Sequence, residues 1–251
     1  MQEIKEVLRG QLIQLASVMA FGLFLGLFEW RFAVRDNKKY REHWIDALGI
    51  FCVFLGACSF ALSVAALRKL PVLHSLQTTI NELPWYVLVP AASLAADFIN
   101  YLAHRLLHSK HFWNFHRWHH SPEQLFWFSG FRGSFVHIFL LGFKNILILS
   151  ISNLNPIVLA TIGVQGLYAQ MAGHVNFDLH IPILDRILVT PQYHRIHHAF
   201  ERKLHDSNYS FVWTFWDKIF GTQTLPESMP DFFPLGLTPS EKVGLWRMLL
   251  G

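Results

Sequence analysis

The sequence predicts an all-α integral membrane protein with four to five transmembrane helices and a helical cap on the cytoplasmic side. Two observations predict this class. Of the 251 residues, 52% are hydrophobic and only 15% are charged, which is apolar for a soluble globular protein. The apolar residues also gather in uncharged runs of about 20 residues, the length that a helix needs to cross a bilayer. We expect residues 1–251 to form one domain.

Five apolar runs account for the predicted helices. In chain order they are Gly10 to Phe28, Ala47 to Leu67, Leu83 to Ala96, Val136 to Ile151 and Pro156 to Gly173. Lys144 is the one Lys, Arg, Asp or Glu within these runs. The short polar turn Ser152 to Asn155 separates the last two runs, which predicts a helical hairpin. Lys5 and Arg9 precede the first run, but its length favours a membrane helix over a signal peptide.

Basic residues in the loops predict the orientation of the helices. The N-terminal segment carries Lys5 and Arg9, and the second loop carries Arg68 and Lys69. The first loop carries five basic residues: Arg31, Arg35, Lys38, Lys39 and Arg41. Because basic loops stay on the cytoplasmic side, we expect the first loop there, and the later histidine-rich segments fall on the same side. The membrane is expected to be the bacterial inner membrane, or the endoplasmic reticulum in a eukaryote.

Charge and cysteine content exclude some classes of partner and bond. The formal net charge is +4, yet no Lys/Arg stripe with interleaved aromatic residues occurs, so no nucleic-acid partner is predicted. Cys52 and Cys58 both lie in an apolar run. They are predicted to be small buried hydrophobic residues rather than a disulfide or a metal-binding pair.

The histidines show the most specific pattern in the chain. Asp97, Tyr101, His104 and His108 follow at intervals of four, three and four, so on a helix they share one face. Two arrays then repeat the spacing i, i+3, i+4, and one more histidine follows the fifth apolar run. The nine candidate ligands are His104, His108, His116, His119, His120, His174, His194, His197 and His198.

These nine residues predict a pair of metal ions held in the cytoplasmic cap. So many imidazoles would be costly to bury unless they coordinate metal. Nine donors exceed the four ligands of one zinc ion, so two ions are predicted. Imidazole suits iron, zinc, copper and nickel, so ligand type alone leaves the metal open. Thr190-Pro191 favours a helix start before the second array, and Ser121-Pro122 closes the first.

The remaining histidines are predicted to lie at the surface or behind the ligands. They are His43, His74, His111, His137, His180 and His205. Ligating histidines usually donate their second N–H to a carboxylate or a carbonyl. The candidates for that role are Asp97, Asn176, Asp178, Asp206 and Asn208.

Several motifs occur together and in order between Asp97 and Thr222. They are D-F-x-x-Y-x-x-H-R-x-x-H from Asp97, W-x-F-H-x-x-H-H-S from Trp113, G-H-x-N from Gly173, T-P-x-x-H-R-x-H-H from Thr190, D-x-N-Y from Asp206 and W-D-K-I-F-G-T from Trp216. With these motifs, about half of the chain resembles the fatty acid hydroxylase / sterol desaturase superfamily of membrane non-haem di-iron proteins. Residues 83–222 are expected to form its catalytic region. Many members have Arg-x-His-Pro where Arg132 is followed here by Gly-Ser-Phe. Because of this difference, the substrates of other members are not assigned to this chain.

The resemblance implies an O2-dependent oxidoreductase. Two iron ions would bind at the nine histidines, with zinc as an alternative occupant in purified material, and O2 would be the co-substrate. The reaction would hydroxylate a C–H bond of a fatty acyl, sterol or other lipid, with desaturation as the near alternative. The lipid would enter from the bilayer. We expect Trp113, Trp127 and Arg132 to contact it, with membrane anchoring as the alternative for the two tryptophans.

The sequence also limits the other partners and classes. No Gly-rich dinucleotide fingerprint and no C-x-x-C-H haem motif occurs, so electrons are expected from a separate carrier, such as a ferredoxin or a cytochrome b5-like protein with its reductase. Neither E-x-x-H nor H-E-x-x-H occurs, which argues against a carboxylate-bridged di-iron bundle and a zincin protease. A zinc-binding or metal-transport membrane protein is the more distant alternative. Transport favours polar residues along membrane helices, and these runs have few.

Overall fold

The computed structural model of the chain describes residues 2–34, 43–178, 181–230 and 232–251. These residues form helices and two isolated β-bridges, without a strand among them, so the predicted all-α class is confirmed. The elements are α1 (Gln2–Phe32), α2 (His43–Leu67), η2 (Pro71–Leu73), α3 (His74–Glu82), α4 (Trp85–Leu107), α5 (Trp113–His116), η3 (Ser129–Phe131), α6 (Phe135–Ile151), α7 (Pro156–Met171), η4 (Ala172–His174), α8 (Pro182–Asp185), α9 (Pro191–His197), α10 (Arg202–His205), α11 (Phe215–Ile219), η5 (Pro226–Ser228) and α12 (Leu245–Leu250).

Three helices are long and apolar enough to cross a membrane. The spans are Leu8–Phe32, Trp44–Leu67 and Trp85–Leu107. Helix α6 has 17 residues and α7 has 16. At a rise of 1.5 Å per residue, these two helices reach about 25 Å, less than the ~30 Å hydrocarbon core. The chain is therefore an integral membrane protein, and three helices of its described part qualify as spans by length and composition. The α6–α7 hairpin is shorter, so the expected total of four to five spans stays a prediction.

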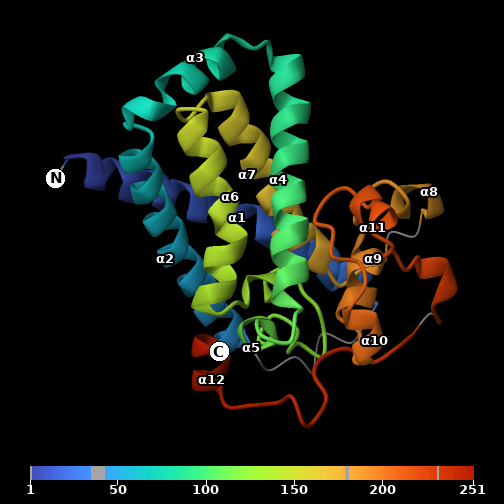
Figure 1. The fold of residues 1–251 in the computed structure, drawn as a ribbon. Coiled ribbons are helices and arrows are strands. Elements are labelled where there is room, and N and C mark those ends of the chain that lie inside the picture. The colour runs from blue at the N-terminus through green and yellow to red at the C-terminus, as the bar shows by residue number, and fades with distance from the viewer. Residues whose placement is uncertain (1, 35–42, 179–180, 231) are drawn as a thin grey trace.

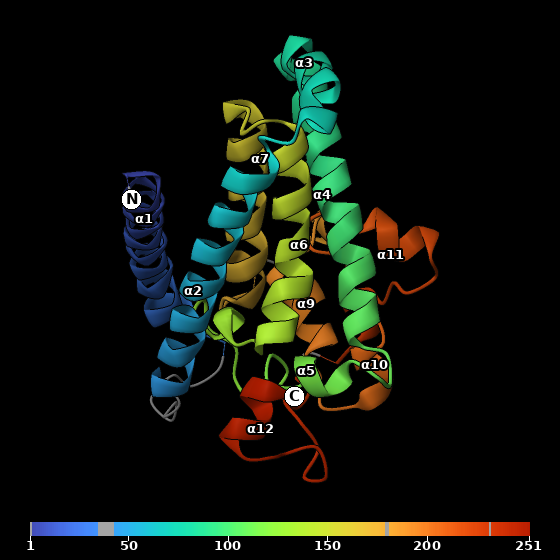
Figure 2. The same cartoon turned by 60° about the vertical axis from the view of Figure 1, so that its left-hand side comes forward.

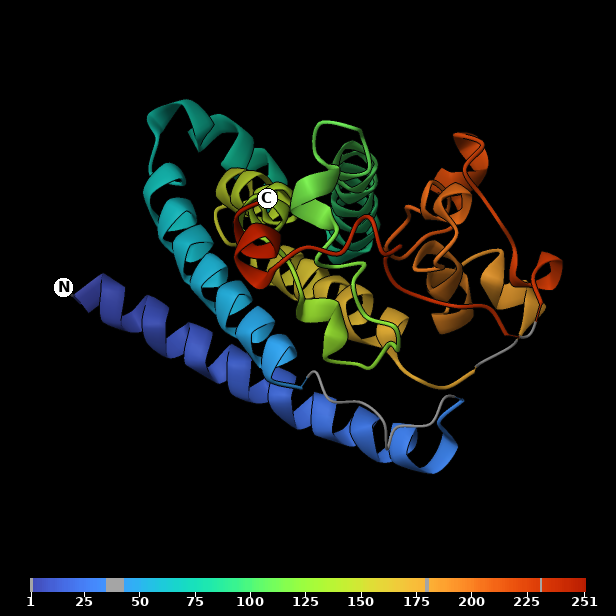
Figure 3. The same cartoon turned by 90° about the horizontal axis from the view of Figure 1, so that it is seen from below.

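The bundle has a histidine end and a far end. Helices α2, α4, α6 and α7 lie side by side, and α1 runs obliquely across the outer side of α2 (Figures 1 and 3). At the histidine end α4 ends, α6 begins, and α5 and α12 lie beneath them (Figure 2). The segment from α8 to α11 packs beside the lower half of α4 (Figure 1). Helices α5 and α12 thus cover one end of the bundle, and the segment from α8 to α11 covers one side (Figures 1 and 2).

Exposed aromatic residues mark both borders of the predicted membrane region. Trp30, near the end of α1, is 81% exposed, and Trp44, at the start of α2, is 61% exposed. Both helix termini reach the histidine end, since Glu29 accepts from the N–H of Asn176 and Asp46 pairs with Arg132. Trp85 and Tyr86 begin α4 at the far end and are also exposed. Tryptophan and tyrosine favour the two membrane–water interfaces. These pairs therefore place the histidine end near one membrane surface.

The basic first loop lies mostly outside the described residues. Arg31 closes the last turn of α1 at the histidine end. The other four basic residues, Arg35, Lys38, Lys39 and Arg41, fall in the range that the structure does not describe. The predicted cytoplasmic orientation therefore stays a prediction.

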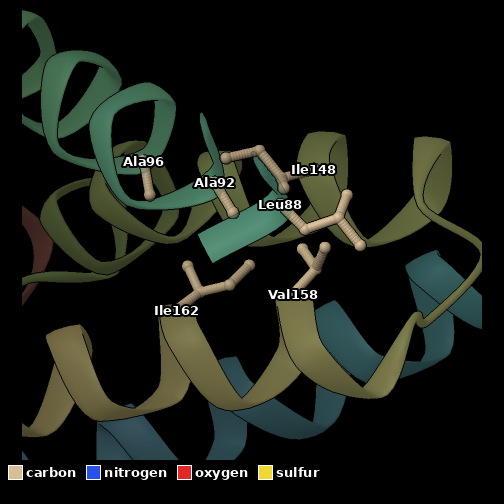
Figure 4. Close-up of a cluster of buried hydrophobic side chains, with 6 residues drawn as sticks. All are labelled: Leu88, Ala92, Ala96, Ile148, Val158 and Ile162. Carbon is tan, nitrogen blue, oxygen red and sulfur yellow. The ribbon is translucent and has the colours of Figure 1, made fainter. Parts of the chain in front are cut away.

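The core of the bundle forms where α4, α6 and α7 meet. Figure 4 shows its six buried side chains: Leu88, Ala92, Ala96, Ile148, Val158 and Ile162. Between apolar helices in lipid, association depends on close packing rather than on release from water. The alanines of α4 permit that close approach. Gly56 and Gly142 do the same between α2 and α6, because an added Cβ would overlap Ile138 and Phe60 respectively.

The predicted helical hairpin of α6 and α7 is confirmed. Its turn places Asn153 and Leu154 at positive φ, and Asn155 caps α7 by accepting a 3.0 Å hydrogen bond from the backbone N–H of Ile157. Helix α3 closes this far end: the Asn155 amide donates to Asn81, and Gln77 donates to the carbonyl of Ser150. These hydrogen bonds fix the position of the hairpin relative to α3 at the far end of the bundle.

Candidate metal centre

All nine predicted histidines lie together at the histidine end, in two groups. In each group, one ring nitrogen per residue lies within 4.8 Å of the others. The first group is His104, His108, His116, His120 and His197, and the second is His119, His174, His194 and His198. All nine side chains are buried. The groups are adjacent, since the rings of His120 and His198 stack at 4.4 Å between centroids.

Both arrays contribute to both groups. On a continuous helix His116 and His119 would share a face, but α5 ends at His116. The i, i+3, i+4 spacing of the first array predicts one helix, and this is wrong because the chain there turns more tightly. The N–H of His119 bonds to the carbonyl of His116, three residues back. This turn directs His116 and His120 to the first group and His119 to the second.

The second array lies on α9, and its predicted helix start is confirmed. The Thr190 hydroxyl accepts a hydrogen bond from the N–H of Tyr193, and Pro191 occupies the first helical position. His197 joins the first group, whereas His194 and the C-cap residue His198 join the second.

Backbone carbonyls hold two rings of the first group in one tautomer. Nδ1 of His104 lies 2.8 Å from the carbonyl oxygen of Tyr209, and Nδ1 of His197 lies 2.7 Å from that of Ser207. A carbonyl only accepts, so each Nδ1 carries the proton and each Nε2 keeps a free lone pair. Yet these two Nε2 atoms lie 3.0 Å apart. Two lone pairs at this distance repel each other unless a cation binds both.

The second group repeats the arrangement. Nδ1 of His119 lies 3.2 Å from the carbonyl oxygen of Arg132, and its Nε2 lies 3.3 Å from Nε2 of His174. Nε2 of His194 lies 3.1 Å from the Nε2 atoms of both His174 and His198. Four ring nitrogens therefore face a common point.

The residues fit bound metal ions in two further respects. Both ring nitrogens of His108 and of His120 are buried without a hydrogen-bond partner among the described residues. Buried polar groups normally have such a partner, and a metal ion would supply it. Burial, reinforced by neighbouring imidazoles, lowers the pKa of both residues well below 6.5. The rings are therefore neutral, and each has a nitrogen lone pair that can coordinate a metal ion. Burial likewise lowers the pKa of His174 to about 3.

The predicted partners of the second imidazole nitrogen lie around the site in different roles. Asp206 Oδ1 is 3.6 Å from Nδ1 of His108, beyond hydrogen-bond range. Asp97 accepts 3.0 Å hydrogen bonds from the N–H groups of Val212 and Trp213, so it fastens α4 to the C-terminal segment.

The other three candidates also join segments around the site. The Asn208 amide donates to the carbonyls of Tyr193 and Thr224. The N–H of Asn176 donates to the Glu29 carboxylate, and Asp178 accepts from Arg195.

Two residues near the ligands have roles that spacing did not reveal. Asp217 accepts hydrogen bonds from the N–H of Tyr209 at 2.8 Å and from the Tyr193 hydroxyl at 3.0 Å. It thereby fixes the segment whose carbonyl orients His104. His137 is buried, with its Nδ1 2.7 Å from that of His116.

The remaining histidines are divided between the site and the surface. His205 is buried with its ring 5.0 Å from that of His120, and His74 and His111 are exposed. The side chain of His43, and His180, lie outside the described residues.

The three predicted substrate contacts occupy packed positions. The Trp113 ring lies 5.2 Å from the rings of both His108 and His120. Trp127 fills a recess of α1, where a Cβ on Gly22 would overlap its ring.

Arg132 is fully buried and links three segments. Its Nε lies 2.5 Å from Oδ1 of Asp46 on α2, and it donates to Ser121 at 2.9 Å. Because its carbonyl accepts from His119, the ion pair connects α2 to the second histidine group.

The comparison with known families shows to which family the chain belongs. The family model described as fatty acid hydroxylase matches residues 89–222, more than half of the chain. The chain belongs to the fatty acid hydroxylase family. The match begins within α4 and ends beyond α11, so it contains both histidine groups. Membership makes the chain an oxidoreductase of a metal-dependent class.

Curated relatives have lipid-oxidising names. The chain is 26% identical over 244 residues to the ornithine lipid hydroxylase OlsE of Rhizobium tropici, covering 94% of this chain and 73% of that protein. It is 36% identical over 140 residues to the alkylglycerol monooxygenase of Homo sapiens, covering 55% of this chain and 30% of that protein. The Danio rerio alkylglycerol monooxygenase is 31% identical over 66% of this chain and 37% of its own length. The chain thus spans about a third of the alkylglycerol monooxygenases it matches. No solved structure matches.

Removal of either partner of the Asp46–Arg132 pair is predicted to destabilise the protein strongly. Asp46→Asn or Arg132→Met leaves a buried group without its counterpart, which costs about 3–5 kcal/mol of unfolding free energy. The double variant should lose less than the sum of the two single losses. Denaturant titration in micelles measures these values. Arg186→Met, which breaks an exposed pair with Glu227, is the control and should cost under ~1 kcal/mol. Single losses below the control value would contradict this role.

Acid is predicted to destabilise the metal-free protein below pH 6.5. Burial lowers the pKa of His119, His197 and His198 well below the ordinary value of 6.5. The unfolded chain therefore binds more protons below pH 6.5, and each such residue removes up to about 1.4 kcal/mol per pH unit. Thermal unfolding between pH 7.5 and 5.5 measures the effect. His111→Ala, at an exposed site, should follow the wild-type curve. An unfolding temperature that is constant over this range would contradict the prediction.

Proposed function

We propose that the chain is a membrane di-iron hydroxylase that oxidises a lipid C–H bond. One observation carries the metal part of the proposal: the Nε2 atoms of His104 and His197 lie 3.0 Å apart while carbonyls hold both Nδ1 protons. A bound cation makes this contact favourable. Family membership, with relatives named as a lipid hydroxylase and monooxygenases, supports the oxidation of a lipid.

Iron is the proposed metal at both groups. The first group has five imidazole donors, one more than tetrahedral zinc takes in structural sites. Imidazole suits iron, and iron is redox-active whereas zinc is not. Zinc found in purified protein would then be a substitute occupant.

The proposed reaction consumes one O2 for each lipid. Two bound irons would supply the O2 activation that an unactivated C–H bond requires. The balance is R–H + O2 + two electrons + two protons giving R–OH + H2O. The chain holds nine neutral imidazoles in place and excludes water from them by burial. The names of the relatives favour hydroxylation over desaturation, which would remove a second hydrogen instead of adding oxygen.

The two electrons are proposed to come from a separate acidic carrier. The Trp113 ring contacts His108 and His120 of the first histidine group, and the Arg202 guanidinium lies 4.3 Å from its centroid. Arg202 is exposed and pairs with Glu241 at 2.8 Å. Lys203 is exposed next to Arg202. Basic residues around an entry point attract an acidic partner. The basic first loop supports a cytoplasmic location of this surface, where a ferredoxin or cytochrome b5-like carrier would be present.

Oxygen labelling tests the proposed function. Cells that express the protein are grown under 18O2, and their lipids are compared by mass spectrometry with those of cells expressing His197→Ala. We expect one 18O atom in a lipid that wild type produces, and at least a tenfold loss in the variant, because His197 belongs to the first group. His111→Ala is the matched control and should retain the product. Stoichiometric zinc with no O2-dependent product would contradict the proposal.

A further inference from the structure

A cavity of about 550 Å³ lies between α1, α2, α6 and α7. These four helices can be followed together in Figure 3. The volume is within the range of ligand pockets, which are mostly apolar with a few polar groups. Apolar side chains such as Val53, Phe60, Ile138 and Leu167 line most of it. A lipid chain is the ligand that such a wall in a membrane protein favours.

One end of the cavity reaches the histidine groups. Phe131, His137 and Gln170 line this end. His137 contacts His116 of the first group through their Nδ1 atoms, 2.7 Å apart. Its ring also lies 5.2 Å from that of His119 in the second group. A single imidazole therefore separates the cavity from both groups.

Lys144 lines the same cavity and lacks an anionic partner. Its side chain is buried, and its Nζ donates a 3.1 Å hydrogen bond to the carbonyl of Leu141 on its own helix. An ammonium has three donors, so two remain. Among the described residues no carboxylate lies within 4.0 Å of Nζ. On the neighbouring helix α4, both oxygens of Asp97 accept backbone N–H groups. A buried charge in a membrane helix is costly unless it is paired.

We propose that this cavity binds the substrate lipid and that the Lys144 ammonium pairs with an anionic oxygen of that lipid, a carboxylate or a phosphate. Asn145, which also lines the cavity, offers an amide donor to the same oxygen. Seven residues of α6 separate Lys144 from His137, or about 10 Å along the helix. The acyl chain therefore runs from Lys144 to the histidine end, and the oxidised carbon lies several bonds from the anionic group. This inference rests on the proposed function only in taking the histidine end as the reacting end.

Equilibrium binding to the metal-loaded protein without reductant tests the proposal. The probes are palmitic acid, hexadecyl phosphate and methyl palmitate, which share a chain length and differ in the charged oxygen. Wild type is expected to bind at least one of the two anions tenfold or more tighter than the ester. Whichever anion is preferred identifies the carboxylate or the phosphate. Equal binding of all three probes, or no binding, would overturn the proposal.

Charge variants locate the preference. Lys144→Met should remove the preference for the anion, and Lys144→Arg should keep it. Arg68→Met is the matched control, because Arg68 lines the far end of the same cavity. Persistence of the preference in Lys144→Met, or its loss only in Arg68→Met, would overturn the assignment to Lys144.

A cavity-filling variant locates the chain independently of Lys144. Gly166 lines the cavity on α7, and an added Cβ there meets no atom within 4 Å, so Gly166→Leu adds bulk at the cavity wall. It should weaken binding of all three probes at least tenfold. Gly10→Leu, which is in open space on α1 outside the lining, should bind as wild type. Unchanged binding in Gly166→Leu would overturn the location.

These measurements are separate from the test of the proposed function. Because no reductant is present, binding does not depend on turnover. A chain that binds the anion but hydroxylates no lipid would contradict the proposed function alone. A chain that hydroxylates a lipid without the preference at Lys144 would contradict this inference alone.

Discussion

The contact between unprotonated imidazole nitrogens is the constraint on which the rest of the structure depends. His104 and His197 direct lone pairs at each other across 3.0 Å, and their Nδ1 protons are committed to backbone carbonyls. The polypeptide alone gives this contact no compensation, whereas a bound cation turns it from repulsive to attractive. Folding and metal binding are coupled in such a site, because the metal gains its ligands only once both arrays meet.

The surrounding segments act mainly to keep these rings in place. Asp217 fixes the Tyr209 segment, and that carbonyl sets the tautomer of His104. Arg132 is buried against Asp46 while its own carbonyl accepts from His119, so a membrane helix and a histidine group share one support. The bundle, the cap and the loop between them therefore form one structural unit around the histidines.

Sequence patterns predicted the elements whose signal is local. The apolar runs predicted α1, α2 and the α6–α7 hairpin, and Thr190-Pro191 predicted the start of α9, because hydrophobicity and capping are properties of neighbouring residues. Helical spacing also selected the nine clustered histidines and left out the exposed His111. The same spacing failed after His116, where the chain turns too tightly for a helix and sends His119 and His120 to different groups.

The rest depends on contacts that sequence patterns do not carry. Any residue has a carbonyl, so nothing in the sequence marks those of Tyr209 or Ser207 as the partners of ligands. The ion pair of Arg132 with Asp46 joins two residues that are far apart in the sequence, so no local spacing predicts it. The cavity beside Lys144 forms only where four helices meet. The position of Lys144 in an apolar run therefore does not predict that a cavity lies next to its side chain.

The central claim is that each histidine group holds its own metal ion. The most direct test is the iron content per chain, measured by elemental analysis after anaerobic loading, in two double variants. His108→Ala/His120→Ala removes two ligands from the first group, and His119→Ala/His174→Ala removes two from the second. We predict two irons in wild type and one in each double variant. A single iron in wild type, or the loss of both irons in either variant, would contradict the claim.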